Sequence, residues 1–309
     1  MAGEDSVTTL VTASEETCWL GEGPLWDPVR SQLLWVDIRN GKVFRGRLRT
    51  DDTIETLETV QLGETVGAVG VSRSGEWILA GQKRMHFRST AGGITSGPII
   101  LPESASSRLN DGKADPAGRY LIGTLSLAGP SETESLVAIE ADASVRTLDA
   151  DLTLSNGLAW SPDGHTMYNV DTIRQLVFAR PYDPATGETG ERKAFLTFAE
   201  GYPDGMTVDA SGHLWIAMWG LGEVRRYSPD GHLALSINVP APHTSSVAFA
   251  GAELDVLVIT TATQDLSQEQ LAAHPLSGRI FTIRTGVHGF PQPLWSGLPL
   301  SIDQSQRNR

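Results

Sequence analysis

Cysteine is nearly absent from this chain, because Cys18 is the only one among 309 residues. That excludes a disulfide framework and a thiolate metal site. Basic residues are also scarce, with 24 Lys and Arg against 37 Asp and Glu, for a formal net charge of −13. Nucleic acids and anionic membranes need a basic face, so we expect neither as a partner. The same surplus of negative charge is compatible with binding a cation.

Long apolar segments are missing as well. No apolar run is long enough to span a bilayer, and the opening residues MAGEDSVTTL have neither the basic nor the apolar part of a signal peptide. These absences predict a soluble, cytoplasmic protein. Glycine and proline are scattered as turn residues and the charges are mixed in sign, which argues against disorder. We expect a single domain over residues 1–309.

What the chain does contain is a recurring turn that ends in glycine and is followed by a short apolar strand. The clear copies are VSRSGEWILAG, ADPAGRYLIGT, WSPDGHTMYNV and VDASGHLWIAM. Their turn glycines are Gly75, Gly118, Gly164 and Gly212, at intervals of 43, 46 and 48 residues. Two weaker copies, LWDPVRSQLLWVDI and AFAGAELDVLVITTA, have Arg30 and Glu253 at the glycine position. The sequence therefore contains six copies of one unit.

Each copy consists of strands. After the third clear turn come TMYNVDT, QLVFARPYD and RKAFLTFAE, which are short β-rich runs separated by turn residues. With the strand before the turn, that makes four strands per copy, and a four-stranded unit at this period is typical of a propeller blade. We predict an all-β fold, a six-bladed β-propeller with four antiparallel strands per blade.

The repeat also predicts where the blades begin and how the ring closes. The first strands are expected near residues 22–27, 67–72, 110–115, 156–161, 204–209 and 245–250. The N-terminal segment VTTLVTA has the phase of an outer strand and is expected to complete the last blade. A short helix in DLSQEQLAAH is expected as a loop insertion.

A ring of polar residues follows from the alignment of the copies. Eight residues before the glycine position stand Glu22, Gly67, Asn110, Asn156, Asp204 and Ser245. The first strand of every propeller blade lines the central channel, so equivalent positions encircle the axis. The carboxylates of Glu22 and Asp204 and the amide oxygen of Asn156 are hard donors for one divalent cation. We expect Ca²⁺ first, with Zn²⁺, Mn²⁺ or Mg²⁺ as alternatives. The competing interpretation is that each residue caps a local turn.

Other polar residues and one aromatic residue stand near the ring positions. Arg108 precedes Asn110 by two residues and is a planar donor that could orient a substrate oxygen, with a surface ion pair as the alternative. We expect Asp111 and Lys113 to be solvated turn residues. Trp219 follows a strand end and is a candidate for the pocket wall, with the core as the alternative.

The chain resembles the SMP-30/gluconolactonase/luciferin-regenerating-enzyme family. The resemblance lies in LGEGPLWDP, LLWVDI, RLNDGKADPAGRYLIGT, SNGLAWSPDGHTMY, PDGMTVDASGHLWIAMWG and HPLSGRIFTI, in the family's order over nearly the whole chain. It implies a six-bladed propeller with one divalent metal in the channel. By resemblance, the metal ligands are Glu22, Asn156 and Asp204, the substrate-binding residues are Arg108 and Asn110, and Asp204 is the general base.

The activity implied by the resemblance is hydrolysis of a lactone, a cyclic ester. The cation would polarise the carbonyl, and a water would be deprotonated by Asp204 or made more acidic by the metal. One stretch departs from the family: GTLSLAGPSETES has Leu125, Leu127 and Ala128 where sugar lactonases often have residues that contact substrate hydroxyls. This departure predicts tolerance for lactones less polar than gluconolactone, unless Glu132 or Glu134 folds back over the channel.

Two other functions remain open at this point. One is a related calcium-dependent propeller hydrolase that cleaves phosphoester or phosphofluoride bonds, and the other is a non-catalytic propeller that binds a ligand. Convergent carboxylates in the channel argue against a mere scaffold. The expected partner is a small-molecule lactone, and the expected state is a monomer or a weak homo-oligomer.

Overall fold

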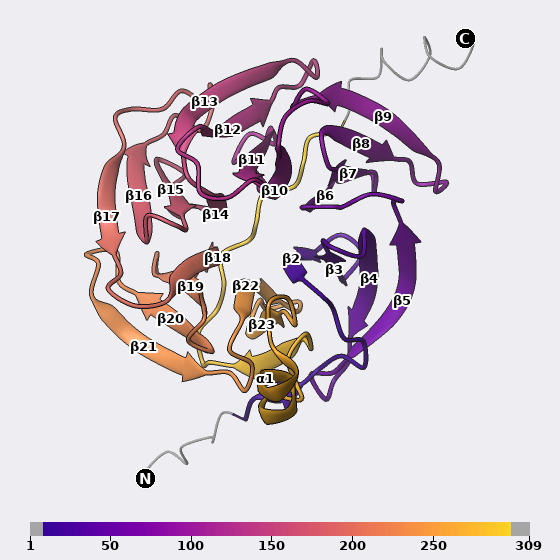
Figure 1. The fold of residues 1–309 in the computed structure, drawn as a ribbon, viewed down its shortest axis with the longest axis vertical. Helices are drawn as coiled ribbons and strands as arrows, with labels where there is room; N and C mark the ends of the chain where they lie inside the picture. The colour runs from indigo at the N-terminus through magenta and orange to yellow at the C-terminus, as the bar shows by residue number, and fades with distance from the viewer. Residues whose placement is uncertain (1–8, 298–309) are drawn as a thin grey trace.

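The computed structural model describes residues 9–297 and is nearly all β-structure. Its strands form six four-stranded sheets arranged around a central axis, so the predicted six-bladed propeller is confirmed (Figure 1). Within each sheet the neighbouring strands are antiparallel.

The first three blades follow one another along the chain, each as a meander from the channel outward. Blade 1 is β2 (Gly21–Asp27), β3 (Gln32–Asp37), β4 (Lys42–Leu48) and β5 (Ile54–Gln61). Blade 2 is β6 (Val69–Val71), β7 (Trp77–Ala80), β8 (Arg84–Arg88) and β9 (Ile94–Ile99). Blade 3 is β10 (Ser107–Ala114), β11 (Tyr120–Ser126), β12 (Glu134–Ile139) and β13 (Val145–Leu152).

The other three blades complete the ring. Blade 4 is β14 (Ser155–Trp160), β15 (Thr166–Asp171), β16 (Leu176–Pro181) and β17 (Lys193–Thr197). Blade 5 is β18 (Tyr202–Val208), β19 (Leu214–Trp219), β20 (Glu223–Tyr227) and β21 (Leu233–Asn238). Blade 6 is β22 (Thr244–Ala250), β23 (Val256–Thr261), β24 (Phe281–Arg284) and, outermost, β1 (Val11–Thr12).

The ring closes by the pairing of the two ends of the chain. Val11 pairs with Thr282 and Thr12 with Phe281, so the predicted N-terminal outer strand is confirmed for these residues. Residues 7 and 8 of that predicted strand lie outside the described residues. The predicted helix is also present, as α1 (Gln268–Ala273) between β23 and β24.

The core lies between adjacent blades and explains the apolar strands of the repeat. Trp26, Trp160 and Trp215 lie in repeat strands and are buried in these layers. The repeat turns have the backbone that their sequence requires, since Gly118 and Gly164 have φ of +85° and +76°. Glycine adopts that left-handed backbone without the steric cost that a Cβ imposes.

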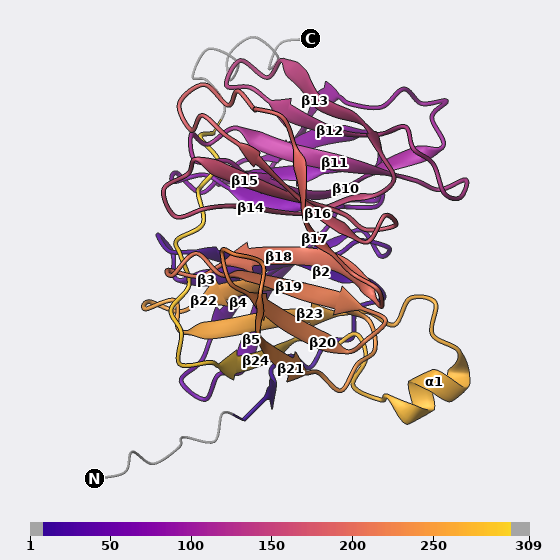
Figure 2. The same ribbon diagram turned by 90° about the vertical axis from the view of Figure 1, so that its left-hand side faces the viewer.

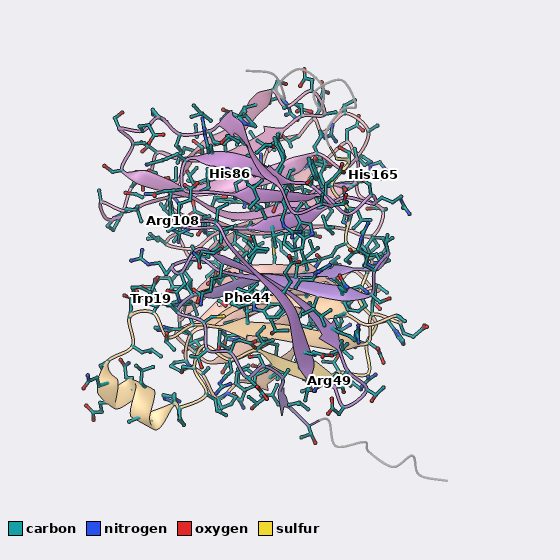
Figure 3. All side chains as sticks on the ribbon, turned by 90° about the vertical axis from the view of Figure 1, so that its right-hand side faces the viewer. Trp19, Phe44, Arg49, His86, Arg108 and His165 are labelled. Carbon is teal, nitrogen blue, oxygen red and sulfur yellow. The ribbon has the colours of Figure 1, made fainter. Side chains whose placement is uncertain are left out.

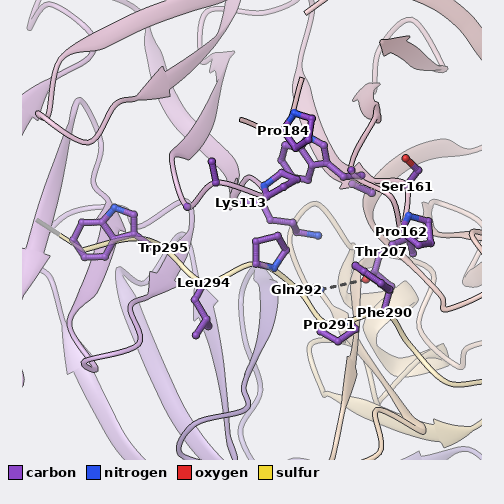
Figure 4. Close-up of a pocket in the computed structure, with 18 of the residues that line it drawn as sticks. Lys113, Ser161, Pro162, Pro184, Thr207, Phe290, Pro291, Gln292, Leu294 and Trp295 are labelled. Atoms are coloured by element: carbon purple, nitrogen blue, oxygen red, sulfur yellow. Dashed lines mark hydrogen bonds between the residues drawn. The ribbon is translucent and has the colours of Figure 1, made fainter. Parts of the chain in front are cut away.

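The two faces of the propeller differ. One face has α1, and the opposite face is crossed by residues 288–296, which we call the strap (Figure 2). The strap is held by backbone hydrogen bonds, from Phe290 to the carbonyl of Val208 and from Trp295 to that of Val71. A cavity of about 740 Å³ lies beside it, and Gln292 donates a hydrogen bond there to Thr207 (Figure 4). No helix among the residues described is long and apolar enough to cross a membrane.

Candidate active site

The oxygen-rich ring predicted from the repeat lies in one cavity of about 330 Å³. Glu22, Asn110, Asn156 and Asp204 all line it, together with Arg108. Each of these five side chains is at least nine-tenths buried. Figure 3 shows Arg108 towards the α1 face of the molecule, whereas His165 lies at the opposite face. The structure therefore brings together every residue predicted for the site.

A break in strand register places these side chains in the channel. The pairing of the innermost strand shifts between Glu22 and Leu25 in β2, and corresponding shifts occur at the ring position of β10, β14, β18 and β22. Such a bulge interrupts the regular alternation of side chains and redirects one of them. This explains why Asn156 can stand in an otherwise apolar strand.

Glycine beside the ring allows the inner strands to converge. A Cβ on Gly157 would lie 2.5 Å from the backbone oxygen of Asp204, and a Cβ on Gly67 would lie 2.3 Å from that of Asn110. No side chain fits at such distances. Gly67 therefore contributes close packing to the ring, and Gly157 brings β14 next to β18.

A chain of hydrogen bonds orients the amides. Arg108 Nη1 donates to Asn110 Oδ1 at 2.9 Å, and Asn110 Nδ2 donates to Asn156 Oδ1 at 3.3 Å. Asn156 Nδ2 donates in turn to Thr172 Oγ1 at 3.1 Å, and that hydroxyl donates to the carbonyl of Pro203. With its nitrogen engaged, Asn156 presents its oxygen to the ring, as a metal ligand requires.

The two carboxylates are poorly satisfied by the protein. Asp204 Oδ1 is buried without a hydrogen-bond partner, and Glu22 Oε2 accepts only the amide of its neighbour Gly23, at 3.1 Å. Burial raises the pKa of Glu22 to about 8, with the Asp111 carboxylate adding to the effect. Burial and then Glu22 raise the pKa of Asp204 well above its usual range. A divalent cation would remove both the repulsion and the unmet hydrogen bonding.

The poorly satisfied carboxylates and the oriented amide of this site fit a bound divalent cation. Within residues 9–297, no three His, Cys, Asp or Glu side chains cluster as a metal-binding group. The candidate centre therefore depends on the amide oxygen of Asn156 in addition to the carboxylates of Glu22 and Asp204. A set made only of oxygen donors suits a hard cation such as Ca²⁺.

Arg108 is a buried cation inside the cavity, with only 4% of its surface exposed. No carboxylate of the described residues lies within ion-pair distance of it, so the alternative of a surface ion pair is wrong. Burial lowers the pKa of Arg108 to about 10, with the charge of Arg39 as the second cause. Arg108 remains charged at neutral pH and can donate to a substrate oxygen.

The prediction that Asp111 and Lys113 are solvated turn residues is wrong. Asn-Asp-Gly favours a turn in isolation, but here it forms the bulge of β10. Asp111 is 7% exposed, and Lys113 Nζ donates across the channel to the carbonyl of Met206 at 2.8 Å. Burial raises the pKa of Asp111 and lowers that of Lys113 to about 8. Both line the axis below the ring.

Sequence reasoning missed much of the cavity wall. The residues it did not single out are Leu20, Ile38, Arg39, Leu154, Thr172, Ile173, Tyr202, Gln264 and Asp265. A signal existed for some of them in the repeated Val-Asp at the end of β3 and β15. Ile38 follows Asp37, and Thr172 follows Asp171 at the equivalent place in its own blade. The repeat therefore brings the two residues that follow each aspartate to the same level of the channel.

The departure from the sugar-lactonase pattern gives the cavity an apolar side. Leu125 and Leu127 line it. Glu132 is 77% exposed in its side chain and lies 3.7 Å from Arg174, while Glu134 is buried and accepts a hydrogen bond from Ser107. Neither glutamate lines the cavity, so no carboxylate from this loop replaces the missing polar contacts.

An aromatic residue forms part of the opposite wall. Trp219 lines the cavity, as one of the two predictions for it had stated. His243 stacks on its far side, with ring centroids 4.1 Å apart and planes at 12°. His243 Nδ1 contacts the carbonyl oxygen of Gln264. This stacking fixes the indole against the cavity.

The fold and the site define a β-propeller with an oxygen-lined cavity at one mouth of its channel. Residues 20–263 match the family described as SMP-30/Gluconolactonase/LRE-like region, and this chain belongs to that family. The resemblance predicted from the sequence motifs is thereby confirmed.

Two curated relatives are similar over almost their whole length. A 6-deoxy-6-sulfogluconolactonase of Pseudomonas putida is 34% identical, over 94% of this chain and 99% of its own. A pentonolactonase of Haloferax volcanii is 32% identical, over 92% of this chain and 97% of its own.

A solved structure is similar as well. The regucalcin of Agrobacterium tumefaciens, described as a calcium-binding protein, superposes with a TM-score of 0.85. It is 30% identical, and the match covers 91% of this chain and 95% of that one.

Proposed function

We propose that this protein hydrolyses the ester bond of a small lactone, assisted by one divalent cation held by Glu22, Asn156 and Asp204. The observation that carries the proposal is the buried, unpartnered Oδ1 of Asp204 in a cavity shared with Glu22 and Arg108. Buried carboxylates with shifted pKa values that face a cavity are the kind of group found at functional sites. The relatives named as lactonases support a lactone as the substrate class.

Each side chain has a distinct role in this proposal. Arg108 and Asn110 hold the ester or a neighbouring hydroxyl, because Arg108 is a buried donor oriented by its bond to Asn110. Asp204 takes the proton from the attacking water, and a cation beside it would keep the carboxylate ionised and able to accept that proton. When bound, a divalent cation would polarise the carbonyl and stabilise the charge that develops on its oxygen. We propose Ca²⁺, which is supported by the similarity to the regucalcin of Agrobacterium tumefaciens, a calcium-binding protein.

The apolar side of the cavity favours lactones less polar than gluconolactone. Leu125 and Leu127 cannot bond sugar hydroxyls, so a polyhydroxylated ring loses hydrogen bonds there, and an alkyl substituent gains contact. The two lactonase relatives carry names of sugar lactones, so this is a difference that we propose for the present chain.

A panel of lactones with and without a chelator tests the proposal. We expect hydrolysis of five- and six-membered lactones, loss of it on chelation, and higher kcat/KM for alkyl-substituted rings than for gluconolactone. Asp204→Asn should lower kcat by about 10²- to 10⁴-fold, the usual contribution of a general base. Asp230→Asn, at an exposed turn, is the matched control and should retain activity. Hydrolysis that survives both chelation and Asp204→Asn would contradict the mechanism.

A further inference from the structure

Arg39 is a cation at the mouth of the cavity that the mechanism above does not use. It follows β3 directly, lines the same cavity as Arg108, and is exposed. Its guanidinium carbon lies over the ring of Trp19, 5.1 Å from the centroid. Figure 3 shows Trp19 on the side of the molecule that has α1 and Arg108. The stacking holds the guanidinium at the rim and leaves its N–H groups available.

The nearest carboxylate in the sequence does not pair with Arg39, because it is already occupied. Asp37 accepts hydrogen bonds from the backbone of Trp19 at 2.9 Å and of Leu20 at 3.1 Å. It also accepts the side-chain amide of Asn40 at 2.7 Å. These bonds fix the turn that carries Arg39 and occupy the oxygens of Asp37 that could otherwise accept from its guanidinium.

Arg39 and Arg108 differ in ion pairing from most arginines of residues 9–297. Most arginines of the described chain form ion pairs with Asp or Glu, as Arg119 does with Asp115. Arg39 and Arg108 share one cavity, and no carboxylate of residues 9–297 lies within 4.0 Å of either. Two guanidiniums that line one cavity without a directly paired carboxylate have N–H groups to offer an oxyanion.

We propose that Arg39 binds an oxyanion, a carboxylate or a sulfonate, carried by the ring substituent of the lactone. The inference rests on the proposed lactonase function and names its substrate class: a lactone with an anionic side group and few ring hydroxyls. The ring would lie against Leu125 and Leu127, with its ester at Arg108 and Asn110. Guanidinium groups bind such oxyanions through two parallel N–H···O bonds, which fixes the orientation of the ligand.

The carboxylate that hydrolysis itself creates is a different anion. It forms at the ester carbon, beside the buried Arg108, whereas Arg39 is exposed at the rim. One acidic residue on the rim, Asp265, also lines the cavity and opposes an anionic ligand. Neutralising Asp265 should therefore strengthen the binding of an anionic lactone, whereas neutralising Arg39 should weaken it.

The experiment compares lactones that differ only in charge. The probes are γ-butyrolactone with a carboxymethyl group, the same ring with a sulfomethyl group, and the neutral carbamoylmethyl isostere. The measured quantity is the ratio of kcat/KM for each anionic lactone to that for the amide. Arg39→Gln should lower this ratio by about tenfold, the lower end for a charge-assisted hydrogen bond at an exposed site. Arg39→Lys should lower it less, and Asp265→Asn should raise it.

Arg73→Gln is the matched control, since Arg73 is exposed at the opposite mouth and has no ion-pair partner among the residues described. An unchanged ratio in Arg39→Gln, or an equal fall in Arg73→Gln, would overturn the role of Arg39 while leaving lactone hydrolysis intact. A fall for only one anion identifies the group that Arg39 selects. If the parent hydrolyses neither these three nor any lactone of the panel above, the proposed function fails. Equilibrium binding of the same lactones to the parent and to Arg39→Gln then decides the role of Arg39.

Discussion

Glu22 and Asp204 are carboxyl groups whose charged form is disfavoured both by burial and by neighbouring negative charge. Both are at least nine-tenths buried, and Asp111 faces them from β10 as a third carboxylate. Arg108 is the cation whose charge opposes these shifts for both residues. Without a cation, the folded protein therefore favours protons at this site that the unfolded chain would release, so its stability depends on pH.

Stability of the metal-free protein should fall as pH rises from about 5 to 8. The pKa of Glu22 is raised from an ordinary 4.5 to about 8 in the folded protein, so in this window the folded state binds a proton that the unfolded state lacks. The free energy of unfolding then decreases by on the order of 1 kcal/mol per pH unit. Chemical denaturation in the presence of a chelator, at several pH values, measures the slope.

The variant Glu22→Gln should flatten that slope, because the amide does not titrate and no longer repels Asp204. Glu132→Gln, whose side chain is 77% exposed, is the matched control and should leave the slope unchanged. A metal-free protein that becomes more stable between pH 5 and 8 would contradict the buried-carboxylate account.

At the scale of elements, the bulged inner strands decide the geometry of the site. The register shift in β14 includes Asn156, and the one in β18 includes Asp204. These two strands approach so closely at Gly157 that no Cβ fits between them. The separation of two candidate ligands thus depends on a residue that has no side chain.

We expect Gly157→Ala to weaken cation binding although it removes no ligand. The new Cβ would lie 2.5 Å from the backbone oxygen of Asp204 and must displace β18. Changes that reorient metal ligands commonly cost about 10- to 100-fold in affinity. Calorimetric titration with Ca²⁺ measures the loss.

Gly93→Ala offers the comparison, since its Cβ would meet only the hydroxyl of Ser89 at 3.6 Å, which is ordinary contact. It should bind Ca²⁺ as the parent does. Equal affinities in the Gly157→Ala and Gly93→Ala proteins would show that the spacing of β14 and β18 does not control the site.

For the whole molecule, the candidate ligands join parts of the ring that are distant in the sequence. Glu22 comes from blade 1, Asn156 from blade 4 and Asp204 from blade 5. The pairing of β1 with β24 joins the N-terminal and C-terminal parts of the chain in blade 6. A cation at the axis would link three blades, so its binding energy adds to the stability of the entire propeller.

Ca²⁺ should therefore raise the melting temperature of the whole protein, with one equivalent bound. At a free concentration about 100 times Kd, binding adds roughly 2.7 kcal/mol to the free energy of unfolding. Asn156→Ala should lose most of the increase, and Asn238→Ala, at an exposed edge position, should keep it. Thermal denaturation across a Ca²⁺ titration, with elemental analysis for the stoichiometry, checks both. A melting temperature that Ca²⁺ does not change would contradict the proposed site.

The repeat determined the blade count, the inner strands and the polar ring, because propeller symmetry turns one sequence phase into one level of the channel. Glu22, Asn110, Asn156 and Asp204 could therefore be grouped without coordinates. Their roles as ligands, base and substrate contacts remain predictions that the experiments above test.

Tertiary structure alone decided what surrounds that ring. Asp111 and Lys113 looked like turn residues because Asn-Asp-Gly favours a turn locally, yet β10 continues through them with a bulge that buries Asp111, and Lys113 lies half-buried beside the channel. The repeated Val-Asp placed Arg39 near the site, but nothing in the sequence showed that Arg39 lacks an ion-pair partner. Asp37 is occupied by backbone groups and Asn40, and that competition exists only once the turn has folded. Periodicity fixes which residues face the axis, whereas pairing between charges depends on distances that only the packed ring sets.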